Sequence, residues 1–226
     1  MLERERREHR FLSVSIYIYI YTYTTHTGLY ELLQRFDDRY SNDDTAEFDY
    51  IITENGISDD TDVLRDAYII EHLLALQYAK EQGIPVRGYI HWTISDNWEW
   101  ADGYCPKFGL VSVNRSSPEM KRTVRDSYYL YQDIATKRII TKKQRADAWK
   151  KVQDAVAAKR TRPFCRAKDG ITTTNTTRAF SSKDWRFTKT LKTMKSTSSL
   201  DPVVLIPGFT SSVYMISHLF FSRTIM

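Results

Sequence analysis

Two short apolar runs, residues 48–53 and 86–94, flank a segment whose apolar residues recur at helical spacing, residues 63–82. The runs are rich in Ile, Val, Tyr and Phe, and they have the length of buried strands. A strand–helix–strand order predicts two parallel strands joined by a crossover helix. Further helices are expected at 28–41, 117–136 and 141–159. This alternation favours an α/β fold built from parallel βα units.

The helix boundaries are predicted from capping and helix-breaking residues. Asp62 or Thr61 is expected to cap the helix over 63–82, and Gly83 and Pro85 are expected to end it. In the same way, the dipeptide at 117–118 (Ser-Pro) is expected to open the helix that runs to residue 136.

The stretch 89–111, YIHWTISDNWEWADGYCPKFGLV, mixes aromatic side chains with carboxylates and an amide. The aromatic residues are Trp92, Trp98, Trp100, Tyr104 and Phe108, and the polar residues are Asp96, Asn97, Glu99 and Asp102. An aromatic face can stack on the apolar side of a pyranose, while carboxylates accept hydrogen bonds from its hydroxyls. The stretch therefore indicates a sugar site, although a core with a polar rim has the same composition.

A further carboxylate, Glu54, ends the first apolar run in the sequence IITENG, residues 51–56. Gly56 allows the chain to turn away from the strand at this point. By itself, a glutamate before a turn is most often a surface residue. Its position at the carboxyl end of a predicted parallel strand also suits an active site.

The two motifs together resemble the last two strand–loop units of the family 1 glycoside hydrolases, the β-glucosidase family. The matching patterns are T-E-N-G at 53–56 and W-x-x-x-D-N-x-E-W-A-x-G-Y-x-x-(K/R)-F-G-L at 92–110. The resemblance implies a partial (β/α)8 TIM barrel, the last two βα units, followed by a helical and irregular extension. A complete barrel needs about 250 residues, more than the 226 present.

The resemblance extends from about residue 28 to residue 187. Beyond the barrel motifs, a helix containing Trp149, the segment RPFCR (162–166) and the segment DWRF (184–187) are similar to one branch of the family. That branch comprises the plant freezing-tolerance galactolipid galactosyltransferases. The sequence of the aromatic stretch is also more similar to this branch than to digestive β-glucosidases.

By resemblance, Glu54 is the catalytic nucleophile of a retaining β-glycosidase, with Thr53, Asn55 and Gly56 as the supporting motif. Retaining enzymes use two carboxyl groups about 5–5.5 Å apart, one as nucleophile and one as general acid. The family's acid lies in an N-E-P motif that is absent from this sequence. Turnover by the chain alone is therefore not expected, and a non-catalytic remnant is the alternative.

The resemblance also assigns sugar contacts to four residues of the aromatic stretch. Trp92 stacks beneath the ring, and Glu99 accepts hydrogen bonds from the C4 and C6 hydroxyls. Trp100 donates its indole N–H to the C3 hydroxyl, and Phe108 forms a wall beside C6. A carboxylate at Glu99 would repel a phosphate, so a β-linked, unphosphorylated glucoside or galactoside is the expected substrate.

The other residues of the aromatic stretch are expected to be structural. Trp98 and Tyr104 are predicted to be core residues, and Asp96, Asn97 and Asp102 are predicted to shape turns. The motifs do not distinguish hydrolysis from transglycosylation, because water and a sugar acceptor attack the same covalent intermediate.

The net charge of +5 is unevenly distributed, because residues 137–195 contain 18 Lys/Arg and 4 Asp. A solvated helix face plus a tail explains this region, and a membrane surface is the alternative partner. Nothing indicates a nucleic acid, a cofactor or a metal, since the five histidines are scattered. The two cysteines do not form a disulfide framework by spacing and leave the compartment unassigned.

Four segments are distinguished: 1–27 unassigned, 28–137 barrel, 138–195 basic extension, and 196–226 unassigned. The Ile-Tyr alternation within 1–27 fits a strand, a poor signal peptide, or a translated simple repeat at a mis-assigned start. The run DPVVLIPGFTSS (201–212) is similar to the oxyanion-loop region of acyltransferase-type lipases. Because no G-x-S-x-G motif accompanies it, no function is assigned.

Overall fold

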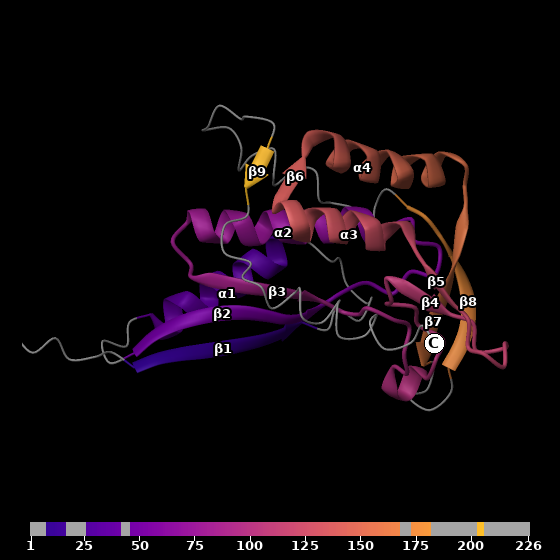
Figure 1. The fold of residues 1–226 in the computed structure, drawn as a ribbon, viewed down its shortest axis with the longest axis horizontal. Coiled ribbons are helices and arrows are strands. Elements are labelled where there is room, and N and C mark those ends of the chain that lie inside the picture. The colour runs from indigo at the N-terminus through magenta and orange to yellow at the C-terminus, as the bar shows by residue number, and fades with distance from the viewer. Residues whose placement is uncertain (1–7, 17–25, 42–45, 168–172, 182–202, 206–226) are drawn as a thin grey trace, which may run out of the picture.

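The structure is a computed structural model that describes residues 8–16, 26–41, 46–167, 173–181 and 203–205. Its largest sheet has three parallel strands in the order β1-β2-β3 (Figure 1). The strands are β1 (Glu8–Ile16), β2 (Ala46–Asn55) and β3 (Val86–His91). Helices α1 (His26–Tyr40) and α2 (Arg65–Glu81) connect them in turn. The predicted succession of parallel βα units is therefore confirmed for these elements.

Strand β2 occupies the centre of the sheet, because Tyr50 pairs with Leu12 of β1 and with Val86 of β3. Its side chains alternate as expected for a strand. Tyr50 and Ile52 are fully buried, whereas Ile51 is only half-buried. Strand β1 lies within the segment that the sequence left unassigned.

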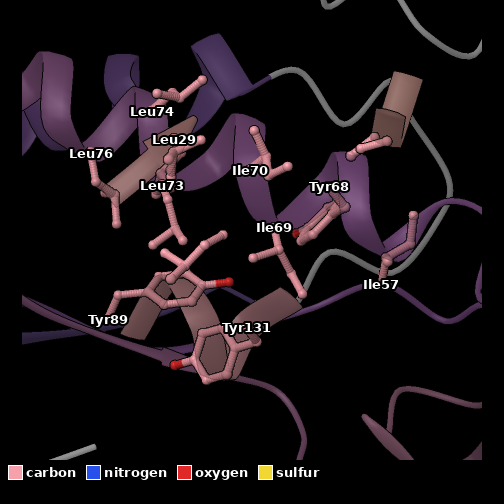
Figure 2. Close-up of a cluster of buried hydrophobic side chains, with 14 of the residues drawn as sticks. Leu29, Ile57, Tyr68, Ile69, Ile70, Leu73, Leu74, Leu76, Tyr89 and Tyr131 are labelled. Atoms are coloured by element: carbon pink, nitrogen blue, oxygen red, sulfur yellow. The ribbon is translucent and has the colours of Figure 1, made fainter. Parts of the chain in front are cut away.

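The hydrophobic core lies between this sheet and the helices. Figure 2 shows Tyr89 of β3 and Tyr131 facing the side chains of α2. Helix α2 has few exposed positions, and its buried apolar residues are Ala67, Tyr68, Ile69, Ile70, Leu73, Leu74, Ala75, Leu76 and Ala79. A helix that is apolar on nearly all sides must be covered by other elements. Helix α1, together with α3 (Asp126–Lys137) and α4 (Lys142–Ala157), provides that cover (Figure 1).

The expected start of helix α2 was wrong, because the helix begins at Arg65 and its N-cap has no side-chain hydrogen bond. Asp59 accepts hydrogen bonds from the backbone N–H groups of Leu64 (2.7 Å) and Thr61 (3.1 Å). Asp62 instead pairs with Arg65. Asp59 therefore stabilises the turn that precedes the helix, whereas Asp62 is held in a buried ion pair and does not cap it.

The expected helix start at residues 117–118 was also wrong. Strands β4 (Val111–Val113) and β5 (Arg122–Val124) form an antiparallel hairpin, and helix α3 (Asp126–Lys137) follows it. Ser117 lies in the turn, where its hydroxyl accepts from Lys121 N–H (2.9 Å) and its carbonyl accepts from Met120 N–H (2.9 Å). Ser-Pro sequences suit a turn as well as a helix start, and pairing across the hairpin decides between them.

The extension after α3 contains regular structure that the sequence described only in part. Helix α4 (Lys142–Ala157) is preceded by β6 (Ile139–Thr141), and Thr141 forms a capping box with Gln144. Strands β7 (Thr161–Ala167) and β8 (Thr173–Ala179) form an antiparallel hairpin. Strand β9 (Val203–Leu205), from the lipase-like segment, pairs antiparallel with β6. Among the described residues, no helix is long and apolar enough to cross a membrane.

Helix α4 contacts α2 through a buried carboxylate, Glu71, which is fully buried. Arg145 donates two hydrogen bonds to it, from Nε to Oε1 (2.6 Å) and from Nη2 to Oε2 (2.9 Å). The indole N–H of Trp149 donates a third to Oε1 (2.7 Å). A charge-assisted fork of this kind fixes the position of α4 against α2.

We expect Arg145→Met to lower the free energy of unfolding by about 3 kcal/mol, because it leaves the buried Glu71 carboxylate without its counter-ion. Lys150→Met is the matched control on the same helix. Lys150 pairs with Asp154 on the solvent side, and its loss should cost less than about 0.5 kcal/mol. Urea denaturation measures both, and equal effects would contradict a specific role of Glu71 in docking α4.

Candidate active site

The site is built where strands β2 and β3 end side by side. Glu54 is the penultimate residue of β2, and Trp92 directly follows β3. Asn55 pairs with His91, and the backbone N–H of Trp92 donates to the carbonyl of Asn55 (3.0 Å). The predicted nucleophile and the predicted stacking residue are therefore brought together at the carboxyl end of a parallel sheet.

The amide of Asn55, in the T-E-N-G motif at 53–56, joins strand β2 to its neighbours through two hydrogen bonds. Its side chain is fully buried, where Nδ2 donates to the hydroxyl of Tyr68 (3.1 Å) and Oδ1 accepts from the hydroxyl of Tyr89 (3.1 Å). These bonds direct Asn55 toward helix α2. The pairing register of β2 shifts between Ile52 and Asn55, so the alternation that buries Tyr50 and Ile52 is interrupted there. Asn55 is therefore buried after the shift, whereas Glu54 beside it is only half-buried.

Gly56 is required by the close approach of two backbones. A Cβ at this position would lie 2.8 Å from the carbonyl carbon of Trp92 and still closer to its oxygen. The peptide bond from Trp92 to Thr93 is cis. Only a glycine leaves room for the end of β3 to approach the loop that follows Glu54.

Glu99 lies on the loop before the short 3₁₀ helix η1 (Trp100–Asp102) and is almost fully buried. Its Oε1 accepts a hydrogen bond from Trp92 Nε1 (3.1 Å), and its Oε2 has no hydrogen-bond partner among the described residues. A buried carboxylate oxygen with unused capacity is an acceptor for ligand hydroxyls. The hydrogen bond also joins Trp92 and Glu99, two residues that the sequence predicted to lie in the same sugar subsite.

The electrostatics around Glu99 favour its protonated form. Burial raises its pKa above the ordinary value of a glutamate, the hydrogen bond from Trp92 lowers it, and the charges of Asp102, Glu54 and Asp96 raise it further. The influence of Glu54 places the two candidate carboxylates in one electrostatic environment. Behind the site, burial first and then Arg65 lower the pKa of His91 to about 3.

The remaining aromatic residues are divided between buried and exposed positions. Phe108 is buried and Trp100 is 67% exposed. The expectation that Trp98 and Tyr104 are core residues was wrong, since they are 55% and 50% exposed. They lie on either side of η1, in the loop that contains it. Trp98 contacts Trp100 (ring centroids 5.9 Å apart), and the guanidinium of Arg115 lies 3.7 Å from the Tyr104 ring centroid.

Sequence reasoning missed the ion pair that holds the base of this loop. Asp96 is buried, and Arg125 donates to both of its carboxylate oxygens (3.1 and 3.0 Å). Arg125 also donates to the carbonyl of Gly109 (2.6 Å), whose N–H donates to Asp96 (2.9 Å). Asp96 therefore fixes the two ends of the loop at residues 96–109, which we call the sugar loop after the subsite that the sequence predicts there. The sequence identified Asp96 only as a turn residue. No local pattern indicated Arg125, which lies 29 positions later.

A second buried arginine, Arg65, connects the loop after Glu54 with the sugar loop. It donates to the carbonyls of Asp59 (2.5 Å) and Lys107 (2.7 Å) and pairs with Asp62. Asp62 accepts from the N–H and the hydroxyl of Ser127 at the start of α3 (2.9 and 2.7 Å). The two loops and helix α3 are thereby joined through one guanidinium group.

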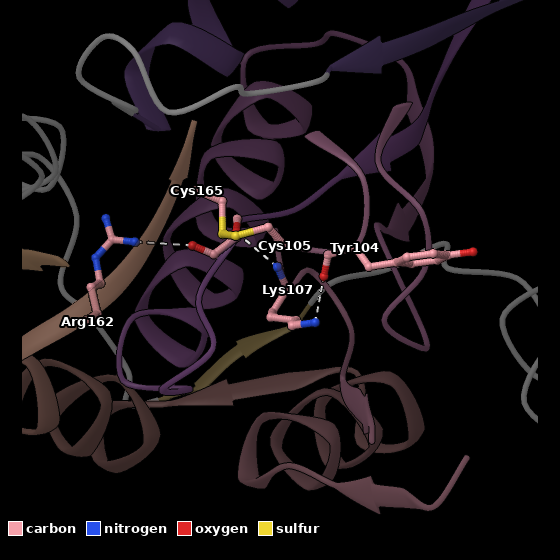
Figure 3. Close-up of a disulfide and its surroundings, with 6 residues drawn as sticks. Tyr104, Cys105, Lys107, Arg162 and Cys165 are labelled. Carbon is pink, nitrogen blue, oxygen red and sulfur yellow. Dashed lines mark hydrogen bonds between the residues drawn. A yellow bond between two sulfur atoms is a disulfide. The ribbon is translucent and has the colours of Figure 1, made fainter. Parts of the chain in front are cut away.

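The cysteines also depart from the expectation, because Cys105 and Cys165 form a disulfide with a Cα–Cα distance of 5.7 Å (Figure 3). Sixty positions separate them. The bond links the sugar loop to strand β7 of the extension. Spacing could not indicate this pairing, because it depends on how the extension folds back.

We expect Gly56→Ala to lower the free energy of unfolding by about 2 kcal/mol, because the added methyl group displaces the Trp92 backbone. Gly88→Ala on β3 is the matched control. Its Cβ would meet Ile51 only at 3.4 Å, an ordinary contact, and the change should stay within about 0.5 kcal/mol. Chemical denaturation compares the two, and a neutral Gly56→Ala would show that the close approach is not required.

Residues 11–140 match the sequence profile of Glycosyl hydrolase family 1. The chain therefore belongs to this family, and the motifs at 53–56 and 92–110 lie within the matched part. Sequence and comparison agree on a glycosidase-type protein.

Two plant proteins are similar over 71% of the chain. One is "Galactolipid galactosyltransferase SFR2, chloroplastic" of Arabidopsis thaliana, 49% identical over 168 residues. The other is "Beta-glucosidase-like SFR2, chloroplastic" of Oryza sativa subsp. japonica, 46% identical over 167 residues. The chain spans about a quarter of these relatives' lengths, 26% and 25%. They match the branch to which the extension motifs pointed.

Among solved structures, the β-glucosidase from Pyrococcus furiosus is 37% identical, with a TM-score of 0.49. The similarity covers 54% of this chain and 24% of that one.

Proposed function

We propose that this chain contributes the nucleophile and part of the sugar subsite of a retaining β-D-glycosidase. The observation that carries the proposal is that β2, which contains Glu54, ends beside β3, which Trp92 follows. Trp92 in turn donates to Glu99, whose Oε2 is left as a buried acceptor. A β-linked glucoside or galactoside is the proposed substrate.

In this mechanism, a carboxylate oxygen of Glu54 attacks the anomeric carbon, and the bond to the aglycone oxygen breaks. The product is a covalent glycosyl–Glu54 ester, which water or another hydroxyl then cleaves with a second inversion. A general acid must protonate the leaving oxygen when the aglycone is a poor leaving group. The N-E-P motif is absent from this sequence, so no residue of this chain is assigned to that role.

The proposed binding roles agree with the surroundings of each residue. Trp92, anchored by Glu99, offers its ring face to the sugar, and Glu99 accepts from the C4 and C6 hydroxyls. Trp100 is exposed and free to donate to the C3 hydroxyl, while Phe108 forms the buried wall beside C6. Each polar contact uses a donor or acceptor that a sugar hydroxyl can match.

A transglycosylase of the same family is the second candidate. It is favoured by the similarity to the Arabidopsis galactolipid galactosyltransferase, which covers 168 residues and so is longer than the family match. In that case a sugar hydroxyl, rather than water, attacks the glycosyl–Glu54 ester. Transfer to galactolipid, measured against release of free sugar, distinguishes the two.

The proposal of a membrane partner concerns the basic extension. On α4, Lys143 and Lys150 each pair with an aspartate four residues later (2.5 and 2.6 Å). These pairs reduce the positive charge that the helix presents. Vesicle flotation at low and high salt tests whether enough charge remains for binding.

The nucleophile can be tested without the missing acid, because a dinitrophenolate leaving group needs no protonation. We expect a dinitrophenyl 2-deoxy-2-fluoro-β-glycoside to label the chain, adding one fluorosugar to Glu54, and peptide mass spectrometry locates the label. Glu54→Gln should remain unlabelled, whereas Glu119→Gln, a change at an exposed glutamate, should label like wild type. Labelling at another carboxylate would overturn the assignment of Glu54.

The raised pKa of Glu99 predicts opposite effects on stability and binding. Folding favours protonated Glu99, so its contribution to stability is full below its unfolded-state pKa of roughly 4.3 and declines as pH rises through the higher folded-state pKa. Glu99→Gln should therefore be more stable than wild type at pH 7 and lose that advantage at pH 4. It should also weaken glycoside binding on the order of tenfold at pH 7.

Thermal denaturation at the two pH values and a binding titration at pH 7 measure these effects. Glu119→Gln again serves as control and should change neither quantity. A Glu99→Gln variant that is less stable than wild type at pH 7 would contradict the unfavourable burial of this charge.

A further inference from the structure

The strand hairpin formed by β7 and β8 holds the sugar loop from outside the family domain. Cys165 of β7 is bonded to Cys105, which lies between the two proposed sugar contacts Trp100 and Phe108. Near the bond, the guanidinium of Arg162 on β7 donates to the carbonyl of Ser58 (3.2 Å), in the loop after Glu54 (Figure 3). One strand therefore contacts both loops that form the site.

The part of the loop that carries Glu99 and Trp100 is short and closed mainly on itself. Glu99 N–H donates to the carbonyl of Gly103 (2.7 Å), Asp102 N–H to that of Glu99 (3.0 Å), and Gly103 N–H to that of Trp100 (3.0 Å). The disulfide-bonded Cys105 lies two residues after Gly103, the last residue of this turn. A covalent restraint at that point limits how far the turn can move as a unit.

The other end of the loop has hydrogen bonds that do not depend on the disulfide. Lys107 N–H donates to Ser58 Oγ (3.1 Å), and the carbonyl of Lys107 accepts from Asp59 N–H (2.9 Å) and from Arg65 (2.7 Å). Cleavage of the S–S bond should therefore loosen the turn at 99–105 without releasing residue 107. The expected effect is graded rather than a loss of the fold.

The disulfide lies outside the hydrophobic core. Cys105 and Cys165 are both half-buried, and neither belongs to the core cluster. Lys107 lies two residues after Cys105, and its Nζ donates to the Tyr104 carbonyl (2.6 Å) beside the disulfide. A nearby cation favours a thiolate, both as attacking group and as leaving group.

We propose that the Cys105–Cys165 disulfide is a redox-controlled latch on the sugar loop, and the proposal rests on the sugar-binding role of Glu99 and Trp100. A dithiol reductant attacks one sulfur as its thiolate, which breaks the S–S bond and forms a mixed disulfide. The second thiol of the reductant then displaces the remaining cysteine. The reductant loses two electrons and becomes a cyclic disulfide, and the protein gains two electrons and two protons as two cysteine thiols.

With the latch open, sugar binding must order the turn at 99–105 that the disulfide otherwise holds. Ordering one or two side chains should weaken binding by about threefold to tenfold. The backbone amides of the sugar loop would also exchange their hydrogens with solvent faster.

The test uses the full chain equilibrated with oxidised or reduced dithiothreitol, with the thiol state verified by alkylation and mass spectrometry. Hydrogen exchange of peptides covering 96–108 reports the loop. A fluorescence titration with deoxynojirimycin or its galacto epimer reports sugar binding. The double variant Cys105→Ser/Cys165→Ser is the control, and it should match reduced wild type and ignore the reductant.

Faster exchange and weaker binding after reduction, both reversed by reoxidation, would support the latch. Unchanged exchange after complete reduction would overturn it, as would equal binding of the iminosugar in the two states. If neither state binds the iminosugar but exchange still depends on reduction, the proposed sugar subsite fails, whereas the mechanical hold of the disulfide stands. The two readouts thereby separate failure of the latch from failure of the proposed function.

Discussion

The buried amide of Asn55 is the contact on which the rest of the site depends. It satisfies its donor with Tyr68 of α2 and its acceptor with Tyr89 of β3, so strand β2, strand β3 and helix α2 meet at one side chain. An unpaired amide there would carry the full free-energy cost of desolvation. Arrangements of β2, β3 and α2 that break either hydrogen bond are therefore disfavoured. The backbone of Asn55 also accepts from Trp92 N–H (3.0 Å), so the same residue places the end of β2, and with it Glu54, beside the start of the loop at Trp92.

Buried charges then hold the loops that the strands leave unconstrained. Asp96 with Arg125 fixes the base of the sugar loop, and Arg65 joins this loop to the one that follows Glu54. Each guanidinium also donates to backbone carbonyls, so these bonds help to offset its desolvation. Such pairs favour one arrangement of the loops over alternatives that would bury a similar amount of apolar surface. On the outer layer, Glu71 does the same for helix α4.

The sequence predicted the structural features that depend on local interactions, and it missed those that depend on residues far apart in the chain. The strands ending at Glu54 and before Trp92 were predictable, because strand alternation and helical periodicity are local patterns. The start of α3 was missed, because Ser117 suits a turn as well as a helix, and the pairing of β4 with β5 selects the turn. The exposure of Trp98 and Tyr104 was missed for a related reason, since a loop's surroundings are set by distant segments.

By itself, the sequence determined the family and the order of the βα units from β2 onward, because these depend on short motifs and on local periodicity. The tertiary structure alone decided which charges pair and which cysteines bond. Arg125 meets Asp96 across 29 positions, and Cys165 meets Cys105 across 60. Partners this far apart are brought together by the packing of whole elements, so no local pattern of residues encodes them.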